Sequence, residues 1–153
     1  MRYIPGIHGL QPRRKTLAQR AYLSVLIPAH RKALTSLLVF SCPRQRYRPR
    51  ILREWRLCHF CKIAVEDEIH ALLRCTIAPG LAELRGLFLA DTYAACPMLV
   101  DTWDRLDDED RLACLLQLSI LDSRLAQYVH LVLELFRAAP VYVPPLSLWY
   151  TPF

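Results

Sequence analysis

The most informative segment of this 153-residue chain reads Cys58-His-Phe-Cys61, then eight residues, then His70, four further residues and Cys75. Two cysteines separated by two residues can turn their thiolates toward one point, and a histidine and a cysteine from a following short helix can complete a tetrahedron around Zn²⁺. A catalytic zinc normally keeps one position for water or substrate, whereas here four good ligands fill every position. The spacing therefore predicts a structural zinc site made by Cys58, Cys61, His70 and Cys75.

The helix expected between the last two ligands poses a problem of geometry. Glu66, Asp67 and Glu68 should lie in its first turn, where acids complement the positive end of the helix dipole. His70 and Cys75 are five positions apart, which at about 100° per residue places them roughly 140° apart on an ideal α-helix. Both side chains can face one ion only if the helix unwinds near Cys75.

The other cysteines and the histidine inside the segment leave alternatives open. His59 is a rival ligand, but the cysteines at 58 and 61 must turn inward, so its side chain is expected to point outward. The six cysteines are expected to be thiols or metal ligands, although their even number keeps disulfides as an alternative. Cys114 lies among leucines and is expected to be a core thiol, whereas Cys42 and Cys96 are expected to be spare.

Composition favours a mainly α fold, a small helical domain with a structural zinc-binding loop and irregular, proline-rich N- and C-terminal segments. Hydrophobic residues make up 54% of the chain, and four glycines against eleven prolines favour helices broken by prolines. The acidic run 107–110 should form the first turn of the fifth helix, and Asp122 or Ser123 should cap the sixth. Apolar periodicity predicts these helices at about 17–26, 29–40, 81–90, 98–103, 111–120 and 123–139.

Three consecutive segments are expected along the chain. Residues 1–56 form a basic helical lead that ends in an arginine-rich connector. Residues 57–91 form the zinc-binding module, whose ligands occur in the order Cys, Cys, His, Cys. Residues 92–153 form a helical region with an extended aromatic tail, which should pack with the module as one compact unit.

Positive charge is concentrated in the first of these segments. Residues 1–56 contain 13 of the 20 Lys and Arg against one acid, a net charge of +12, whereas residues 57–153 carry −6. Guanidinium groups suit phosphate oxygens and aromatic rings stack on exposed bases, so RNA or single-stranded DNA is the expected partner. The alternative is a solvated linker, with Trp55 and Leu57 packed beneath the metal loop. The residues expected to contact nucleic acid are Arg44, Arg46, Tyr47, Arg48, Arg50, Arg53, Trp55 and Arg56.

Neither a membrane span nor a secretion signal is expected. No apolar run reaches the roughly 18 residues that cross a bilayer. The first six residues, Met-Arg-Tyr-Ile-Pro-Gly, lack the apolar stretch and small-residue cleavage site of a signal peptide. The expectation is an intracellular protein, in the nucleus or cytoplasm, with no membrane partner.

Residues 53–75 resemble a known zinc-binding region. Their sequence is Arg-Glu-Trp-Arg-Leu-Cys-His-Phe-Cys-Lys-Ile-Ala-Val-Glu-Asp-Glu-Ile-His-Ala-Leu-Leu-Arg-Cys. That region follows the polymerase domain in reverse transcriptases of non-LTR retrotransposons. The shared features are two close cysteines, an acidic step, a histidine followed by two leucines and a cysteine, and a leucine- and arginine-containing helix such as 81–89. The likeness is specific over 57–75 and weak outside it.

The resemblance implies a small nucleic-acid-associated zinc module from the C-terminal end of a retroelement polyprotein. It also places the family's metal ligands on Cys58, Cys61, His70 and Cys75. The chain has no Asp-Asp polymerase motif in a strand context and no endonuclease constellation, so the resemblance does not carry reverse transcription over to it.

Three classes of function are compatible with these observations. The first is a non-catalytic zinc module that contacts nucleic acid through its arginine-rich segment. The second is a helical protein-interaction domain, in which the apolar helices after Pro79 bind a protein partner and zinc is purely structural. The third is an enzyme, which is the least expected because the acidic run 107–110 is best explained as a helix start.

Overall fold

The fold is built from helices, which confirms the predicted mainly α class. A computed structural model describes residues 21–38, 53–140 and 142. These residues contain no β-strand, and their single β-bridge joins Leu57 to Val65. The elements are η1 (Ala21–Ser24), α1 (Pro28–Leu38), η3 (Arg53–Trp55), the π-turn η4 (His70–Arg74), α2 (Leu81–Ala95), α3 (Met98–Trp103), α4 (Asp108–Gln117), η5 (Ser119–Leu121) and α5 (Asp122–Ala138).

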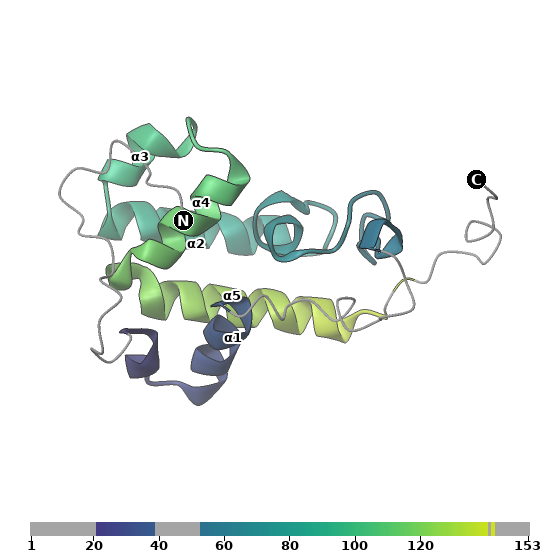
Figure 1. Cartoon of the computed structure of the whole chain (residues 1–153), viewed down its shortest axis with the longest axis horizontal. Helices are drawn as coiled ribbons and strands as arrows, with labels where there is room; N and C mark the ends of the chain where they lie inside the picture. The colour runs from purple at the N-terminus through teal and green to yellow at the C-terminus, as the bar shows by residue number, and fades with distance from the viewer. Residues whose placement is uncertain (1–20, 39–52, 141, 143–153) are drawn as a thin grey trace.

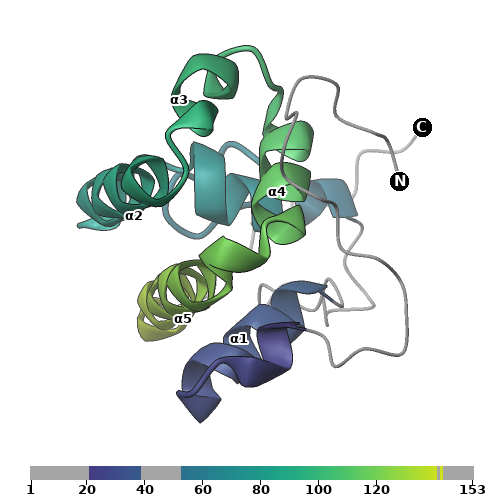
Figure 2. The same ribbon diagram turned by 90° about the vertical axis from the view of Figure 1, so that its left-hand side faces the viewer.

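Helix α5 is the central element, against which α1, α2 and η4 pack. It runs between α1 on one side and α2 on the other, an arrangement seen from two directions in Figures 1 and 2. Its apolar residues recur at three- and four-residue spacing, which places them on a common face. The residues buried along it are Asp122, Leu125, Ala126, Tyr128, Val129, Val132, Leu133 and Phe136.

The covered face of α5 bears on the protein-interaction hypothesis. A docking helix needs apolar side chains that remain exposed in the free protein. The apolar residues that recur at helical spacing along α5 are all at most 7% exposed: Leu125, Val129, Val132, Leu133 and Phe136. Helices of the same chain therefore already occupy the surface that this hypothesis requires.

Helices α3 and α4 follow the sequence prediction closely. The acidic run begins α4 as expected, because Asp107 is the N-cap and its Oδ1 accepts a hydrogen bond of 2.8 Å from the backbone N–H of Asp110. Cys114 is buried in the core as predicted. Cys96, expected to be spare, is buried there too.

Four helix boundaries differ from the prediction. Helix α4 ends at Gln117 rather than near residue 120, and the short turn η5 follows it. Helix α2 continues five residues past Ala90 to Ala95, because Thr92 is fully buried and Tyr93 packs edge-on against Trp103. Of the first predicted helix, the described part is the short 3₁₀ turn η1. Helix α5 begins after Leu121, and no side chain caps it, so neither of the two expected residues is its cap.

The buried residues form one hydrophobic core that draws on all three predicted segments. Leu34 and Leu37 come from the first segment, Leu72 and Leu81 from the zinc module, and most of the remainder from the helices after residue 92. The predicted division of the chain itself stays a prediction. In the part of the chain that the structure describes, no helix combines the length and apolar character needed to cross a membrane.

The contact between α1 and α5 predicts a loss of stability in acid. The rings of His30 and His130 lie 5.0 Å apart between centroids, and burial followed by the charge of His130 lowers the pKa of His30 from its ordinary 6.5. Helix α1 carries Arg31 and Lys32 but no acid. Below about pH 6.5 the unfolded chain therefore binds more protons than the folded chain, and the free energy of unfolding should fall as pH drops.

Urea unfolding at about pH 7.5 and about pH 5.5 would measure this effect. The variant His30→Gln should lose less stability than the parent chain over the same interval, because its position 30 cannot be protonated. Acid-dependent changes at groups that do not interact with His30 are common to both proteins and cancel in the comparison. An identical loss in both would contradict the assignment to His30.

Candidate metal centre

A short hairpin of residues 56–66 presents the first two cysteines. The bridge between Leu57 and Val65 pairs its two arms, and the backbone N–H of Cys58 donates to the carbonyl of Ala64 at 2.8 Å. The turn is closed by Lys62, whose N–H donates to the Cys58 carbonyl at 2.8 Å and whose φ of 58° lies in the left-handed region. This fold of the backbone brings the side chains at 58 and 61 to the same side.

His59 lies inside the protein, which corrects the expectation that it points outward. Its Nδ1 is 2.5 Å from Oε2 of Glu66, and the two side chains are 1% and 0% exposed. The ring also packs against Phe60 and Phe136, at centroid distances of 4.5 Å and 5.0 Å. The cysteines do turn the His59 side chain away from the ligand cluster, but they turn it into the core rather than into solvent.

The last two ligands are the first residue of the π-turn η4, His70, and its C-cap, Cys75. Asp67 lies just before this turn, and its Oδ1 accepts a hydrogen bond of 2.8 Å from the backbone N–H of His70. The N–H of Cys75 donates to the carbonyl of His70 at 2.7 Å, a bond between residues five apart. A π-helical turn is wider than an α-helical turn, so residues five apart lie almost above one another. The predicted unwinding near Cys75 thus takes the form of a widened turn.

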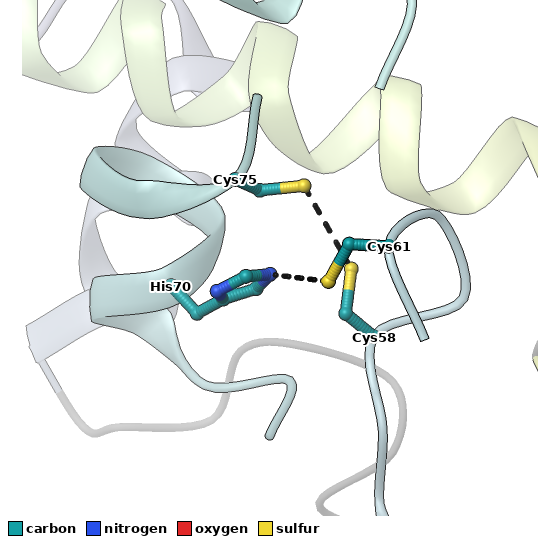
Figure 3. A group of neighbouring side chains, drawn as sticks. All are labelled: Cys58, Cys61, His70 and Cys75. Carbon is teal, nitrogen blue, oxygen red and sulfur yellow. Dashed lines mark hydrogen bonds between the residues drawn. The ribbon is translucent and has the colours of Figure 1, made fainter. Parts of the chain in front are cut away.

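The four predicted ligands meet at one point (Figure 3). In a tetrahedral zinc site with Zn–S of about 2.3 Å and Zn–N of about 2.0 Å, two sulfurs lie about 3.8 Å apart and a sulfur and a nitrogen about 3.5 Å apart. The sulfurs of Cys58 and Cys75 are 3.8 Å apart, and the sulfur of Cys61 is 3.4 Å from Nε2 of His70. All four ligand atoms lie within 4.8 Å of one another. The cluster therefore has the donor set and the spacing to hold a metal ion.

Burial sets the protonation of the cluster. It raises the pKa of Cys58 to about 12, with the neighbouring thiols adding to the rise and two backbone N–H groups opposing it. Burial also raises the pKa of Cys61, but hydrogen bonds from the backbone of Ala64, Ile63 and Cys61 and from the Cys58 side chain together outweigh it, and the net pKa is lowered. The pKa of His70 is lowered, mainly by burial. A neutral imidazole and a readily formed thiolate are the forms that bind metal.

An open cleft of about 400 Å³ borders the π-turn on the side of the hairpin. Nδ1 of His70 is buried and has no hydrogen-bond partner among the described residues. When Nε2 binds a metal, Nδ1 carries the proton of the neutral ring. The residues lining the cleft are Glu54, Ala64, Val65, Asp67, His70 and Arg74.

The predicted nucleic-acid contacts fall mostly outside the described residues. Arg53 and Trp55 bound the short turn η3, and the ring of Trp55 is half-buried. The carbonyl of Arg56 accepts a hydrogen bond of 2.8 Å from the N–H of Glu66, which joins the end of the arginine-rich segment to the metal hairpin. The others, Arg44, Arg46, Tyr47, Arg48 and Arg50, lie outside the described part.

The pairing of Glu66 with His59 was missed in the sequence, where Glu66 counted only as an acid at a helix start. Nothing in their seven-residue separation signals a contact. The hydrogen bond to Asp67 could have been predicted, because an aspartate directly before a helical turn typically accepts a hydrogen bond from a backbone N–H two or three residues further on.

Comparisons with protein families, with curated proteins and with solved structures found no match. The resemblance to the zinc-binding region of retrotransposon reverse transcriptases therefore stays a prediction from the motif.

Proposed function

We propose that this chain is a non-catalytic zinc-binding module that contacts RNA or single-stranded DNA through its arginine-rich segment. The observation that supports the zinc assignment is the clustering of Cys58, Cys61, His70 and Cys75, in which the Cys58–Cys75 and Cys61–His70 distances match edges of a tetrahedral zinc site and all four ligand atoms lie within 4.8 Å of one another. Three thiolates and one imidazole favour zinc over the hard cations, which prefer oxygen ligands. Four protein ligands leave no position for substrate, so the metal has a structural role.

The nucleic-acid part of the proposal rests on charge and connectivity. The arginine-rich segment enters the metal hairpin directly, and Glu66 ties its last residue to the opposite arm. A folded hairpin fixes one end of the segment, which limits the orientations that its guanidinium groups must lose on binding phosphate. The resemblance to a module of retroelement reverse transcriptases supports the same class of partner. The alternative, a helical protein-interaction domain, is weakened by the covered face of α5.

The first test is metal analysis of the purified chain. One zinc per chain is expected, and replacement of any of Cys58, Cys61, His70 and Cys75 by alanine should abolish tight binding. Cys114→Ala, which removes a core thiol outside the cluster, is the matched control and should keep its zinc. A freshly purified parent chain without zinc would refute the metal assignment.

The second test measures binding of the zinc-loaded chain to labelled single-stranded RNA and DNA at increasing salt. Four phosphate contacts would give a log–log slope near −3, or roughly a 50-fold loss of affinity from 50 to 200 mM salt. Joint replacement of Arg44, Arg46, Arg48 and Arg50 by glutamine should remove most of the binding and of the salt slope.

The control for charge is a chain with exposed arginines replaced elsewhere, Arg105→Gln together with Arg124→Gln. If the segment 44–56 contacts the nucleic acid, this variant should bind with the same affinity and the same salt dependence as the parent chain. Equal weakening in both variants would indicate non-specific attraction to net charge. Absent or salt-insensitive binding by the parent chain would refute the nucleic-acid proposal.

A further inference from the structure

The end of the π-turn has backbone carbonyls that its own helix cannot satisfy. The last carbonyls of any helix lack intrahelical partners and need donors from elsewhere. The carbonyl of Leu72 accepts two such bonds, one from Nε of Arg85 at 2.9 Å and one from the hydroxyl of Tyr128 at 2.5 Å. The carbonyl of Cys75 accepts a bond of 2.7 Å from Nη2 of Arg85. Two side chains thus hold the turn that carries two of the metal ligands.

Both donors come from the helical core rather than from the metal loop. Arg85 belongs to α2 and Tyr128 to α5, 10 and 53 residues beyond Cys75 in the chain. Tyr128 is 3% exposed, and its ring stacks on Phe88 of α2 with centroids 4.2 Å apart and planes 6° apart. A ring held this firmly has little freedom, so its hydroxyl fixes the position of the carbonyl that it contacts.

We propose that Arg85 and Tyr128 are positioning residues of the metal centre, which hold the π-turn in the form that presents His70 and Cys75 to a single ion. On an α-helical turn the two ligands would diverge by roughly 140°. The two side chains donate hydrogen bonds to the carbonyls of Leu72, which lies between the two ligands, and of Cys75, which is one of them. They therefore constrain the backbone that positions both ligands. This inference rests on the proposed metal-binding function.

The positive charge of Arg85 should also stabilise the metal-bound centre. Three thiolates and a divalent cation leave the centre with one net negative charge, in surroundings that are largely shielded from water. The guanidinium of Arg85 donates to the carbonyl of Cys75, one of the ligands, and so places a positive charge beside the centre. A cation at the end of a helical turn also complements the negative end of its dipole. Removing Arg85 should therefore affect metal binding more than removing the hydroxyl of Tyr128.

The test is the metal affinity of Tyr128→Phe and Arg85→Met, measured by competition with a chelating dye for zinc. Tyr128→Phe keeps the ring and its stacking on Phe88 and removes only the hydroxyl. Loss of groups that orient metal ligands typically weakens metal binding 10- to 100-fold, and we expect a loss in this range for each variant. Arg85→Lys, which keeps the charge but not the forked donor, should restore part of the loss.

Two controls separate positioning from general effects on folding. Tyr93→Phe removes the hydroxyl of a tyrosine in α2 whose ring packs on Trp103. Arg31→Met removes a guanidinium that likewise donates to a backbone carbonyl, that of Leu23 at 3.1 Å, in a different part of the fold. Both should bind zinc as the parent chain does. The absorption spectrum of the cobalt-substituted chain gives a second readout, and we expect its visible bands to shift in Tyr128→Phe and Arg85→Met alone.

The outcomes distinguish this inference from the proposal on which it rests. A parent chain that binds no zinc would overturn both. A parent chain that binds zinc, with unchanged affinity and cobalt spectrum in Tyr128→Phe and Arg85→Met, would overturn the positioning role alone. Equal weakening in the two controls would also overturn it, because the effect would then follow general stability.

Discussion

Removing the metal from the purified chain is expected to lower its thermal unfolding midpoint by about 12 °C. A ligand that binds only the folded state stabilises it by about 4 kcal/mol when its free concentration is a thousand times its Kd. For a chain of this length each kcal/mol corresponds to roughly 3 °C. The ion would cross-link the hairpin that carries Cys58 and Cys61 to the π-turn that carries His70 and Cys75. Without that link, the hairpin is held by one β-bridge, a few hydrogen bonds and the packing of His59 and Phe60 on Phe136.

Scanning calorimetry before and after treatment with a strong chelator measures this effect. The variant Cys75→Ala should already melt at the lower temperature and should not respond to the chelator. The variant Cys96→Ala lacks a buried thiol outside the cluster and should respond as the parent chain does. A midpoint that the chelator leaves unchanged in a zinc-containing parent chain would contradict the idea that the metal stabilises the fold.

The ligands of the candidate site were predictable because their signal is local. The two-residue gap between Cys58 and Cys61 and the distance to His70 and Cys75 carry the chemistry in the sequence itself. The sequence also showed that the turn between His70 and Cys75 could not be an ideal α-helix, because on such a helix the two side chains would not face one ion. It did not show which other conformation the turn adopts. The π-turn depends on donors from α2 and α5, which are far away in the sequence. Such long-range contacts leave no periodic signal.

The helix boundaries also divide into those set by neighbouring residues, which could be predicted, and those set by packing against distant segments, which could not. Helix α3 and the acidic start of α4 were predicted well, because proline and capping residues act on their immediate neighbours. Helix α2 was predicted too short, since Asp91 and Thr92 are polar residues that suggest a helix end. Thr92 is buried against other elements and the helix continues past it, so packing outweighed local preference.

The buried orientation of His59 could not be predicted for a related reason. Because Cys58 and Cys61 turn toward the ligand cluster, the side chain of His59 was expected to point away from it, but the motif contains no information on what lies on that other side. That side is occupied by Phe136 of α5 and by Glu66 of the opposite arm of the hairpin. The metal hairpin is therefore two-sided, with ligands on one side and core contacts on the other.

Replacing Phe136 by alanine is expected to destabilise the chain by about 3–5 kcal/mol, the usual range for truncating a buried phenylalanine. Phe136 is 2% exposed, and its ring meets Phe60 and His59 edge-on, at centroid distances of 5.1 Å and 5.0 Å. Both partners lie between Cys58 and Cys61, so the cavity would open directly beneath the hairpin. The same substitution should therefore also weaken zinc binding, because the hairpin loses the surface on which it rests.

Urea unfolding of the zinc-loaded chain and dye competition for zinc would measure the two effects of Phe136→Ala. Leu99→Ala is the matched control, because Leu99 is fully buried and lies in α3, which follows the end of α2 remote from the hairpin. It should cost about 2–5 kcal/mol but leave zinc affinity unchanged after correction for the unfolded fraction. Gln127→Ala, on the exposed side of α5, should change stability by less than about 0.5 kcal/mol. If Phe136→Ala and Leu99→Ala weakened zinc binding equally, the packing of α5 against the hairpin would have no specific part in metal binding.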